Sequence, residues 1–193
     1  MKRKQNGSFV SELAIFIIFL IGVFSIMVNH MIALSYKGQL DRLAYSASTI
    51  VAERKQLFNG EISISNKGQE IGPALHRLIA SSMKKMNKNF DKNKLSIRVE
   101  MIELEGSSSH SSNVSFNFHS HSIYFPSAKR RNFPDDFNLS KDDALKLLPM
   151  TIRDRYLPLY RVSLSYQIPF DLLGTLNGQS HRIISSSFSF GRI

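Results

Sequence analysis

Residues 7–28 read GSFVSELAIFIIFLIGVFSIMV, and this stretch decides the fold. From Phe9 to Val28 the only strongly polar side chain is Glu12. These roughly 20 residues would form a helix about 30 Å long, which matches the hydrocarbon thickness of a lipid bilayer. With some tilt the helix could extend a few residues further. The sequence therefore predicts a transmembrane helix over residues 8–34.

A short basic segment, Lys2-Arg3-Lys4, precedes the apolar helix. Because positive charge is retained on the cytoplasmic side of a membrane, we expect a cytoplasmic N-terminus and a C-terminal bulk on the opposite side. A cleaved secretory signal would have an apolar core of about 7–15 residues followed by a small-x-small site. Here the core is longer, and the only candidate site, Met31-Ile32-Ala33, has Met where a small residue is needed. We therefore expect the segment to stay as an anchor.

Glu12 is unusual in a membrane helix, because an ionised carboxylate there costs several kcal/mol unless a partner compensates it. One interpretation is that Glu12 lies near enough to the interface to reach water. The other is a cut between Gly7 and Ser8, which would make Ser8 the first residue. The new α-amino cation could then pair with Glu12 of the same chain or of a neighbouring subunit.

The run from Gly7 to Glu12, behind a basic leader and ahead of an apolar helix, resembles the class III signal of type IV pilins, which a prepilin peptidase cuts after the glycine. The leader and the run GSFVSELA are most similar to the TadE/TadF minor pilins of the tight adherence (Tad, Flp pilus) system. Residues 159–166 and 185–192 resemble TadF more than TadE. Leu13 stands where major Flp pilins have tyrosine, which favours a minor subunit over a shaft subunit.

This resemblance implies an inner-membrane protein with a periplasmic C-terminal domain, needed for assembly of pili in adherence and biofilm formation. It implies a prepilin peptidase, other pilus subunits and inner-membrane assembly platform proteins as partners, besides membrane lipid. It also implies a pilin-like fold with a long N-terminal helix that is half in the membrane and half packed on a head domain.

The helix is predicted to continue beyond the membrane over residues 35–60 as an amphipathic segment, ended by Asn59-Gly60. Apolar residues recur there at i, i+3 and i+4 spacing, namely Leu40, Leu43, Ala44, Ala47, Ile50, Val51 and Leu57. Residues 1–7 are then the leader and residues 61–193 the head domain.

The head is predicted to be α+β with a mostly antiparallel sheet. Strict alternation over Leu95–Met101 predicts a strand with one solvated face. Ser140 and Asp143 form a capping-box variant that opens a short helix ending at Leu148. A longer helix is predicted from Pro73 to Lys88. Further strand candidates are residues 61–65, 114–118, 123–125, 161–168 and 182–190.

Charge and composition limit the other functions. The formal net charge of +10 suits anionic lipid, polymer or nucleic acid, but the membrane helix separates the basic head from cytoplasmic DNA, so we expect no nucleic-acid partner. The basic run from Lys84 to Lys94 is interpreted as a solvated helix end. The chain has no cysteine, which excludes disulfides and thiolate metal sites. Without tryptophan, an aromatic interface belt would rely on Tyr36 and Tyr45.

Candidate chemistry is sparse. His119 and His121, near His110, would share one face of a strand and could hold a metal, but a closed site needs four ligands and no carboxylate lies near in sequence. Asp135-Asp136 and Asp142-Asp143 are candidate acid/base pairs, interpreted as a loop and a helix first turn. Lys129-Arg130-Arg131 is interpreted as solvated. We expect no catalytic site and no cofactor. The alternative function is a signal-anchored envelope enzyme or sensor with a periplasmic ligand-binding domain, for which the histidines are the only indication.

Overall fold

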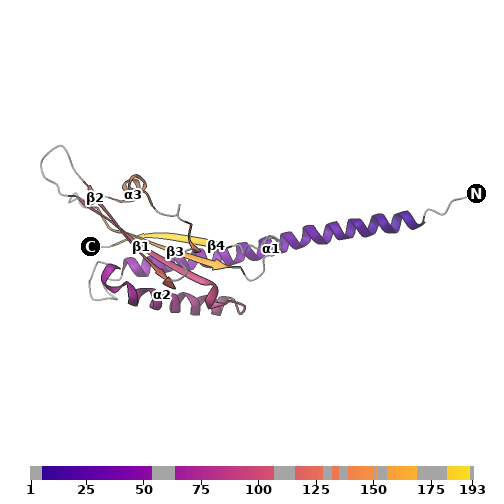
Figure 1. Ribbon diagram of the computed structural model, residues 1–193, viewed down its shortest axis with the longest axis horizontal. Coiled ribbons are helices and arrows are strands. Elements are labelled where there is room, and N and C mark those ends of the chain that lie inside the picture. Colours follow the sequence, from indigo (N-terminus) through magenta and orange to yellow (C-terminus); the bar gives the residue numbers. More distant parts are fainter. Residues whose placement is uncertain are drawn as a thin grey trace, which may run out of the picture.

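The computed structural model describes residues 6–53, 64–106, 116–127, 132–134, 139–149, 151, 156–168 and 182–191. One long helix projects far beyond a head that contains all the other elements (Figure 1). The predicted α+β class is confirmed. The elements in chain order are α1 (Asn6–Ala52), α2 (Ile64–Met86), the 3-10 helix η1 (Lys92–Lys94), β1 (Leu95–Gly106), β2 (Phe116–Phe125), α3 (Lys141–Leu147), β3 (Leu159–Gln167) and β4 (Arg182–Phe190).

Helix α1 is continuous over 47 residues, which corresponds to about 70 Å. Its first half is apolar on all sides and projects from the head, whereas its second half packs on the sheet. The predicted apolar stripe is confirmed, because Leu40, Ala44, Ala47 and Val51 are buried. The predicted helix end at Asn59-Gly60 lies outside the described residues.

The sheet has the strand order β2-β1-β3-β4, and every neighbouring pair is antiparallel. Helix α1 packs against β3 and β4, and α2 packs against β1 and β2, so both helices cover the same face. The main core lies between this face and the helices. Every second residue of β1 and β3 points into this core, as strand geometry requires. The buried residues are Leu95, Ile97, Val99, Met101, Tyr160, Val162, Leu164 and Tyr166.

The prediction that one face of β1 is solvated is wrong. Ser96, Arg98 and Glu100 are all at most 2% exposed. Over β1 and β3, the far face of the sheet is covered by α3 and by residues 132–134. Asn132 donates a hydrogen bond to Ser96 over 2.6 Å, and Phe133 packs near Tyr124. A second, smaller core forms beyond them from Ile102, Leu104, Ala144, Leu148 and Leu159.

Three predicted boundaries also need correction. Residues 64–65 begin α2 instead of ending a strand, because the i, i+4 stripe of Ile71, Leu75, Ile79 and Met83 extends α2 across Pro73. Residues 61–63 lie outside the described part. The strand candidates 114–118 and 123–125 belong to one strand, β2, because β1 pairs with it continuously from residue 116 to residue 125.

The short helix α3 is confirmed. Its N-cap is Ser140, whose hydroxyl accepts a hydrogen bond from the Asp143 N–H, so an otherwise unpaired donor of the first turn is satisfied.

Tyr36 does not belong to a membrane-interface belt. Its ring is buried in the head and stacks on Tyr166, with the ring centroids 5.3 Å apart. Tyr166 stacks on Phe90 in turn, with a centroid distance of 5.1 Å. Tyr45, by contrast, is 66% exposed and lies on the head-packed part of α1.

Candidate assembly interface

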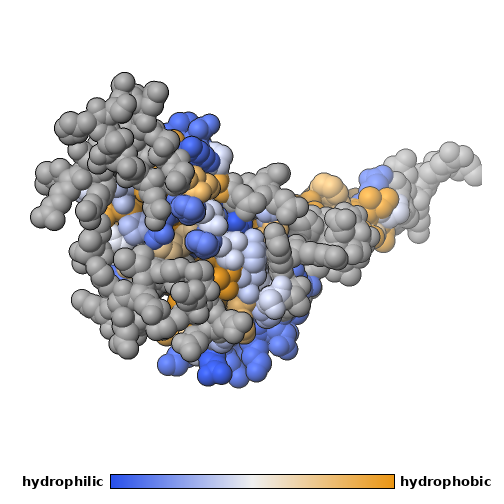
Figure 2. Space-filling model, turned by 60° about the vertical axis from the view of Figure 1, so that its left-hand side comes forward, coloured by the Kyte–Doolittle hydropathy of each residue, from blue (hydrophilic) through white to orange (hydrophobic). Residues whose placement is uncertain are grey.

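The projecting half of α1 is a continuous apolar surface. It is long and apolar enough to cross a membrane, and its most apolar stretch is not buried in the head. Figure 2 shows apolar side chains gathered on this part of the molecule. Large side chains are exposed on all its sides, including Phe9, Leu13, Phe16, Phe19, Phe24, Met27, Met31 and Leu34. An exposed apolar surface of this extent indicates a membrane or protein partner.

Glu12 lies in the second turn of this helix and is exposed. Gly7 and Ser8 belong to its first turn. The spacing of four residues between Ser8 and Glu12 places them on one side of the helix, one turn apart.

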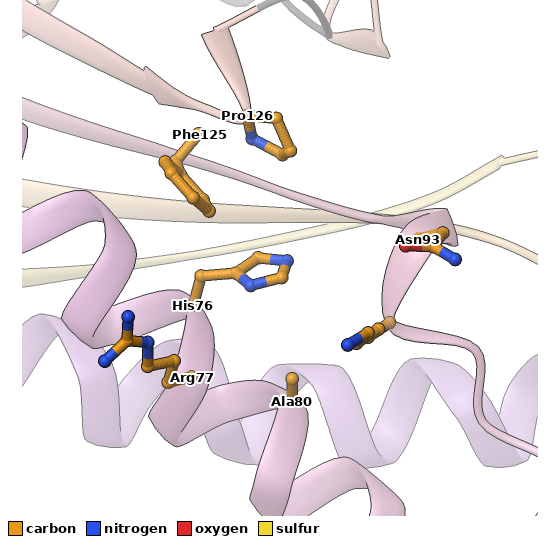
Figure 3. A pocket seen from close by; sticks show the side chains of 7 residues that line it. His76, Arg77, Ala80, Asn93, Phe125 and Pro126 are labelled. Atoms are coloured by element: carbon orange, nitrogen blue, oxygen red, sulfur yellow. The ribbon is translucent and has the colours of Figure 1, made fainter.

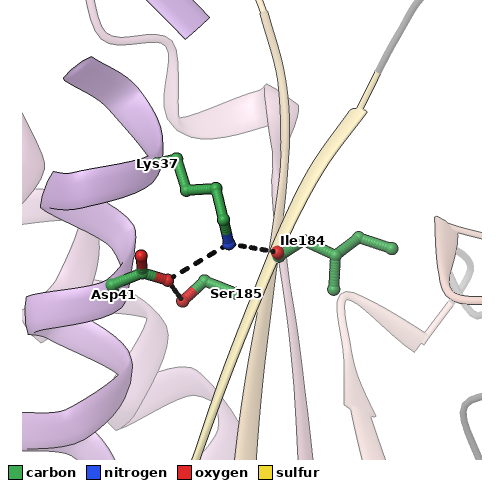
Figure 4. Close-up of polar contacts among 4 residues, drawn as sticks. All are labelled: Lys37, Asp41, Ile184 and Ser185. Atoms are coloured by element: carbon green, nitrogen blue, oxygen red, sulfur yellow. Dashed lines mark hydrogen bonds and ion pairs between the residues drawn. The ribbon is translucent and has the colours of Figure 1, made fainter. Parts of the chain in front are cut away.

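The head-packed half of α1 is tied to β4 by polar contacts at the base of the head. Ser185 donates a hydrogen bond to Asp41 over 2.5 Å, and the Lys37 ammonium lies 3.4 Å from the same carboxylate. Lys37 also donates to the backbone carbonyl of Ile184 over 3.4 Å (Figure 4). The hydrogen bonds from Lys37 to Ile184 and from Ser185 to Asp41 join residues that are more than 140 positions apart in the chain.

The stacked aromatic rings reinforce this junction. The Asp91 N–H donates to the Tyr166 hydroxyl over 3.2 Å. Burial raises the pKa of both Tyr36 and Tyr166 above 10.0, and hydrogen bonds to Asn87 and Asp91 offset part of that rise. The rings pack where α1 leaves the head, so they join the helix to the sheet at that point.

A buried charge network that the sequence analysis missed lies on the far face of the sheet. The Glu100 carboxylate forms ion pairs with two arginines, 3.2 Å from Arg98 and 3.2 Å from Arg161, and all three side chains are at most 5% exposed. Ser120 donates to Glu100, and Arg161 lies over the Phe188 ring. Burial lowers the pKa of Arg161, while the Glu100 charge opposes that effect. The only signal in the sequence is the alternation of Arg98 and Glu100 with apolar residues.

The histidines of the sequence analysis lie on the edge strand β2. His119 and His121 are both exposed and point to the same face, opposite Glu103 and Met101 on β1. Among the described residues, no group of three or more His, Cys, Asp or Glu is placed to hold a metal. His110 lies outside the described residues.

The other charged candidates are placed as follows. Asp142 and Asp143 occupy the first turn of α3, where the helix dipole favours acids. Lys84 and Lys85 are exposed in the last turn of α2, as expected for a solvated helix end. Residues 128–131 and 135–138, which include the other acid pair and basic run, lie outside the described part.

Open grooves among the described residues include one beside each edge of the sheet. The first, of about 610 Å³, lies between α2 and the end of β2 (Figure 3) and is lined by His76, Arg77, Ala80, Lys92, Asn93, Phe125 and Pro126. Figure 3 shows His76 and Phe125 close together in it, with their ring centroids 5.0 Å apart. The second, of about 670 Å³, lies between α1 and β4 and is lined by Tyr45, Thr49, Glu53, Leu157, Phe188, Ser189, Phe190 and Gly191.

Comparison with known proteins gives one match. The model of the TadF family, described as tight adherence pilin protein F, matches residues 1–192. No curated protein and no solved structure matches this chain. The family match extends over both the apolar helix and the head, so it does not rest on the composition of the helix alone.

Proposed function

Because the chain belongs to the TadF family of tight adherence pilin proteins, we propose that it is a minor pilin, processed by a prepilin peptidase and needed to assemble Tad pili in adherence and biofilm formation. One observation carries the proposal. The apolar first half of α1, with Glu12 near its start, is exposed along its length. The same helix continues without a break into the core of a folded head. Pilins are structural proteins, and we propose that this one acts without catalysis.

The proposed cut lies between Gly7 and Ser8. Gly7 lies in the first turn of α1, where the backbone N–H groups have no helical partner and helix ends fray, so the proposed bond lies where the helix opens most readily into a peptidase. After the cut, the α-amino group of Ser8 and the Glu12 carboxylate lie one helical turn apart. An opposite charge at that distance offsets the cost of placing Glu12 in the membrane.

The proposed location follows from the same helix. Residues 8–34 would cross the inner membrane with the N-terminus in the cytoplasm, and residues 61–193 would form a periplasmic head. Lys37 and Asp41 would then lie just outside the membrane. The proposed partners are the prepilin peptidase, other pilus subunits, platform proteins of the inner membrane and membrane lipid.

The test is the N-terminus of the full chain in cells with and without a prepilin peptidase, determined by mass spectrometry. We expect a chain beginning at Ser8 only when the peptidase is present. A chain that keeps Met1 in peptidase-producing cells would refute the proposal. Glu12→Ala should still be cut but should fail to support pili, whereas Ser11→Ala, its neighbour in the same turn, should support them. Normal piliation with Glu12→Ala would remove Glu12 from the mechanism.

A further inference from the structure

The sheet has two outer strands, β2 and β4, whose free edges are available for pairing. Among the described residues, no strand pairs with either outer edge. At the end of β4 the Gly191 N–H donates to the Pro158 carbonyl over 2.8 Å, so Gly191 faces β3 with its backbone groups. Backbone direction alternates along a strand. Ile184, Ser186, Phe188 and Phe190 therefore direct their backbone groups outward, which agrees with Lys37 donating to the Ile184 carbonyl.

Within the described residues, the two edge strands carry few of the features that normally prevent edge pairing. Natural proteins protect an outer strand with charged residues, proline, bulges or a covering element. From residue 183 to residue 190, β4 contains only Ile, Ser and Phe, and β2 from residue 116 to residue 125 contains no Lys, Arg, Asp, Glu or Pro. Lys37 covers the Ile184 carbonyl, but Ser186 and the exposed Phe188 and Phe190 lie beyond its reach.

Strand direction selects the partner. The order β2-β1-β3-β4 with antiparallel neighbours makes β2 and β4 antiparallel to each other. If two copies stand side by side in one membrane, with α1 pointing the same way, the outer edge of β2 in one copy meets the outer edge of β4 in the next as an antiparallel pair. Antiparallel pairing of β4 with β4 would instead turn one α1 around. We propose, on the basis of the proposed membrane anchorage, that β4 of one copy pairs with β2 of a second copy.

The helices beside the two edges have complementary charge. Next to β4, α1 presents a stripe of Asp41, Tyr45, Thr49 and Glu53 at four-residue spacing, and its last three members line the groove beside that strand. Next to β2, α2 presents His76, Ala80 and Lys84 at the same spacing, together with Arg77. With Lys37, which lies at the same spacing and pairs with Asp41, this side of α1 carries two acids and one base. The side of α2 next to β2 carries Arg77, Lys84 and His76 and no acid among these positions, so attraction favours contact between unlike edges over contact between like edges.

The acidic stripe of α1 and the basic side chains of α2 also lie at the same level along the strands of the sheet. Phe125 of β2 pairs with Ile97, Ile97 pairs with Leu164, and Leu164 pairs with Ser185 of β4. Phe125 lines the basic groove, and Ser185 is hydrogen-bonded to Asp41 of the acidic stripe. A purely lateral step between copies therefore brings the basic groove opposite Asp41 and the exposed Tyr45 ring. Such a contact joins unlike surfaces, so it generates rings or helical rows rather than closed two-fold dimers.

The experiment uses the absence of native cysteine. Two full-length chains with different tags are co-produced with a prepilin peptidase, one carrying Ser186→Cys on β4 and the other Ser122→Cys on β2. Both serines are exposed, and both side chains point to the far face of the sheet. A short bismaleimide is added to membranes. When Phe125 is level with Ser185, Ser122 and Ser186 lie on one face as diagonal neighbours, two positions apart along the paired strands, so we expect an adduct containing both tags.

The matched control replaces Ser122→Cys with His121→Cys. His121 is the neighbouring residue of β2, is equally exposed, and points to the opposite face, so the yield of mixed adduct should fall severalfold. A second pair of variants tests the attraction between the two helices. Lys84→Glu, on the side of the basic groove, should reduce the yield severalfold at low salt. Lys85→Glu makes the same change one residue further round the helix and should have little effect.

Three results would overturn the inference: no mixed adduct, an adduct between two Ser186→Cys chains in equal yield, or cross-links to other subunits only. Mass spectrometry of the N-terminus in the same membranes separates this outcome from that of the proposed function. A chain beginning at Ser8 without mixed adducts refutes the pairing and leaves the proposed function intact. A chain that keeps Met1 yet forms the mixed adduct refutes the processing and supports the pairing.

Discussion

Glu100 is the residue on which the far face of the sheet depends, and Glu100→Gln is the most informative perturbation of the head. The carboxylate lies 3.2 Å from each of Arg98 and Arg161, and it is 2% exposed. The substitution keeps the shape and one acceptor oxygen but leaves two buried guanidinium groups without their anion. Removing one partner of a buried ion pair typically costs about 3–5 kcal/mol. We expect a loss in that range, because this one carboxylate serves two cations.

Thermal unfolding of the full chain in detergent, followed by the near-ultraviolet circular dichroism of its tyrosines, measures the effect. A loss of this size lowers the melting temperature of a domain of this length by roughly 10 °C. Glu103→Gln is the matched control, since Glu103 lies on the same strand, is only half-buried and faces the helix side. Adding Arg161→Leu to Glu100→Gln should recover part of the lost stability, because one uncompensated cation is removed. A melting temperature within about 2 °C of the parent for Glu100→Gln would refute the reasoning.

Three further predictions concern the packing of the head. Because burial raises the pKa of Tyr166 in the folded state, its contribution to stability is complete below pH 10.0 and is lost as the pH rises further; comparison of alkaline unfolding with Tyr166→Phe tests this. An added Cβ at Gly191 would lie 2.8 Å from Pro158, so Gly191→Ala should cost about 1–3 kcal/mol in thermal unfolding. Gly38→Ala, with no atom within 4 Å of the new carbon, should not destabilise. Ser185→Ala removes the hydrogen bond to Asp41 and should speed amide exchange in β4 without unfolding the head.

Local patterns were sufficient to predict the long helix. The stripe from Leu40 to Val51 repeats at helical spacing, and every member that the pattern places at its centre is buried. The signal for membrane insertion and the run from Gly7 to Glu12 are also local, since they depend on neighbouring residues in the chain. For the same reason the cap of α3 at Ser140 was predicted correctly.

Local patterns cannot show that the far face of β1 is buried. Alternation of Ser96, Arg98 and Glu100 with apolar residues is the same whether the polar side meets water or protein. Burial here depends on Asn132 and on α3, which reach β1 from distant parts of the chain. A similar limit explains β2, whose polar middle suggested a break, whereas β1 supplies backbone partners along its whole length.

The sequence predicts the apolar helix of the candidate interface but not the contacts that join this helix to the sheet. The apolar helix and Glu12 are evident in the sequence. The contacts that join α1 to β4, such as Asp41 with Ser185, link residues 144 positions apart, and nothing in either segment specifies the other. The proposed docking edge of β4 depends on the strand order, which the sequence of β4 alone does not specify.

The same helix is both the membrane anchor and part of the head core, which has a consequence for how the protein can be divided. Residues 36–52 of α1 bury Tyr36, Leu40, Ala44 and Val51 against the sheet. Fully burying side chains of this kind contributes about 1.5–3 kcal/mol for each of the larger ones, which is a large part of the stability of one domain. A chain that begins at residue 35 should therefore fold to a soluble head with a cooperative thermal transition. A chain that begins at residue 54 should lack that transition and expose the helix-side face of the sheet. A cooperative transition in the shorter chain would show that the head folds without α1 and that α1 is only a tether.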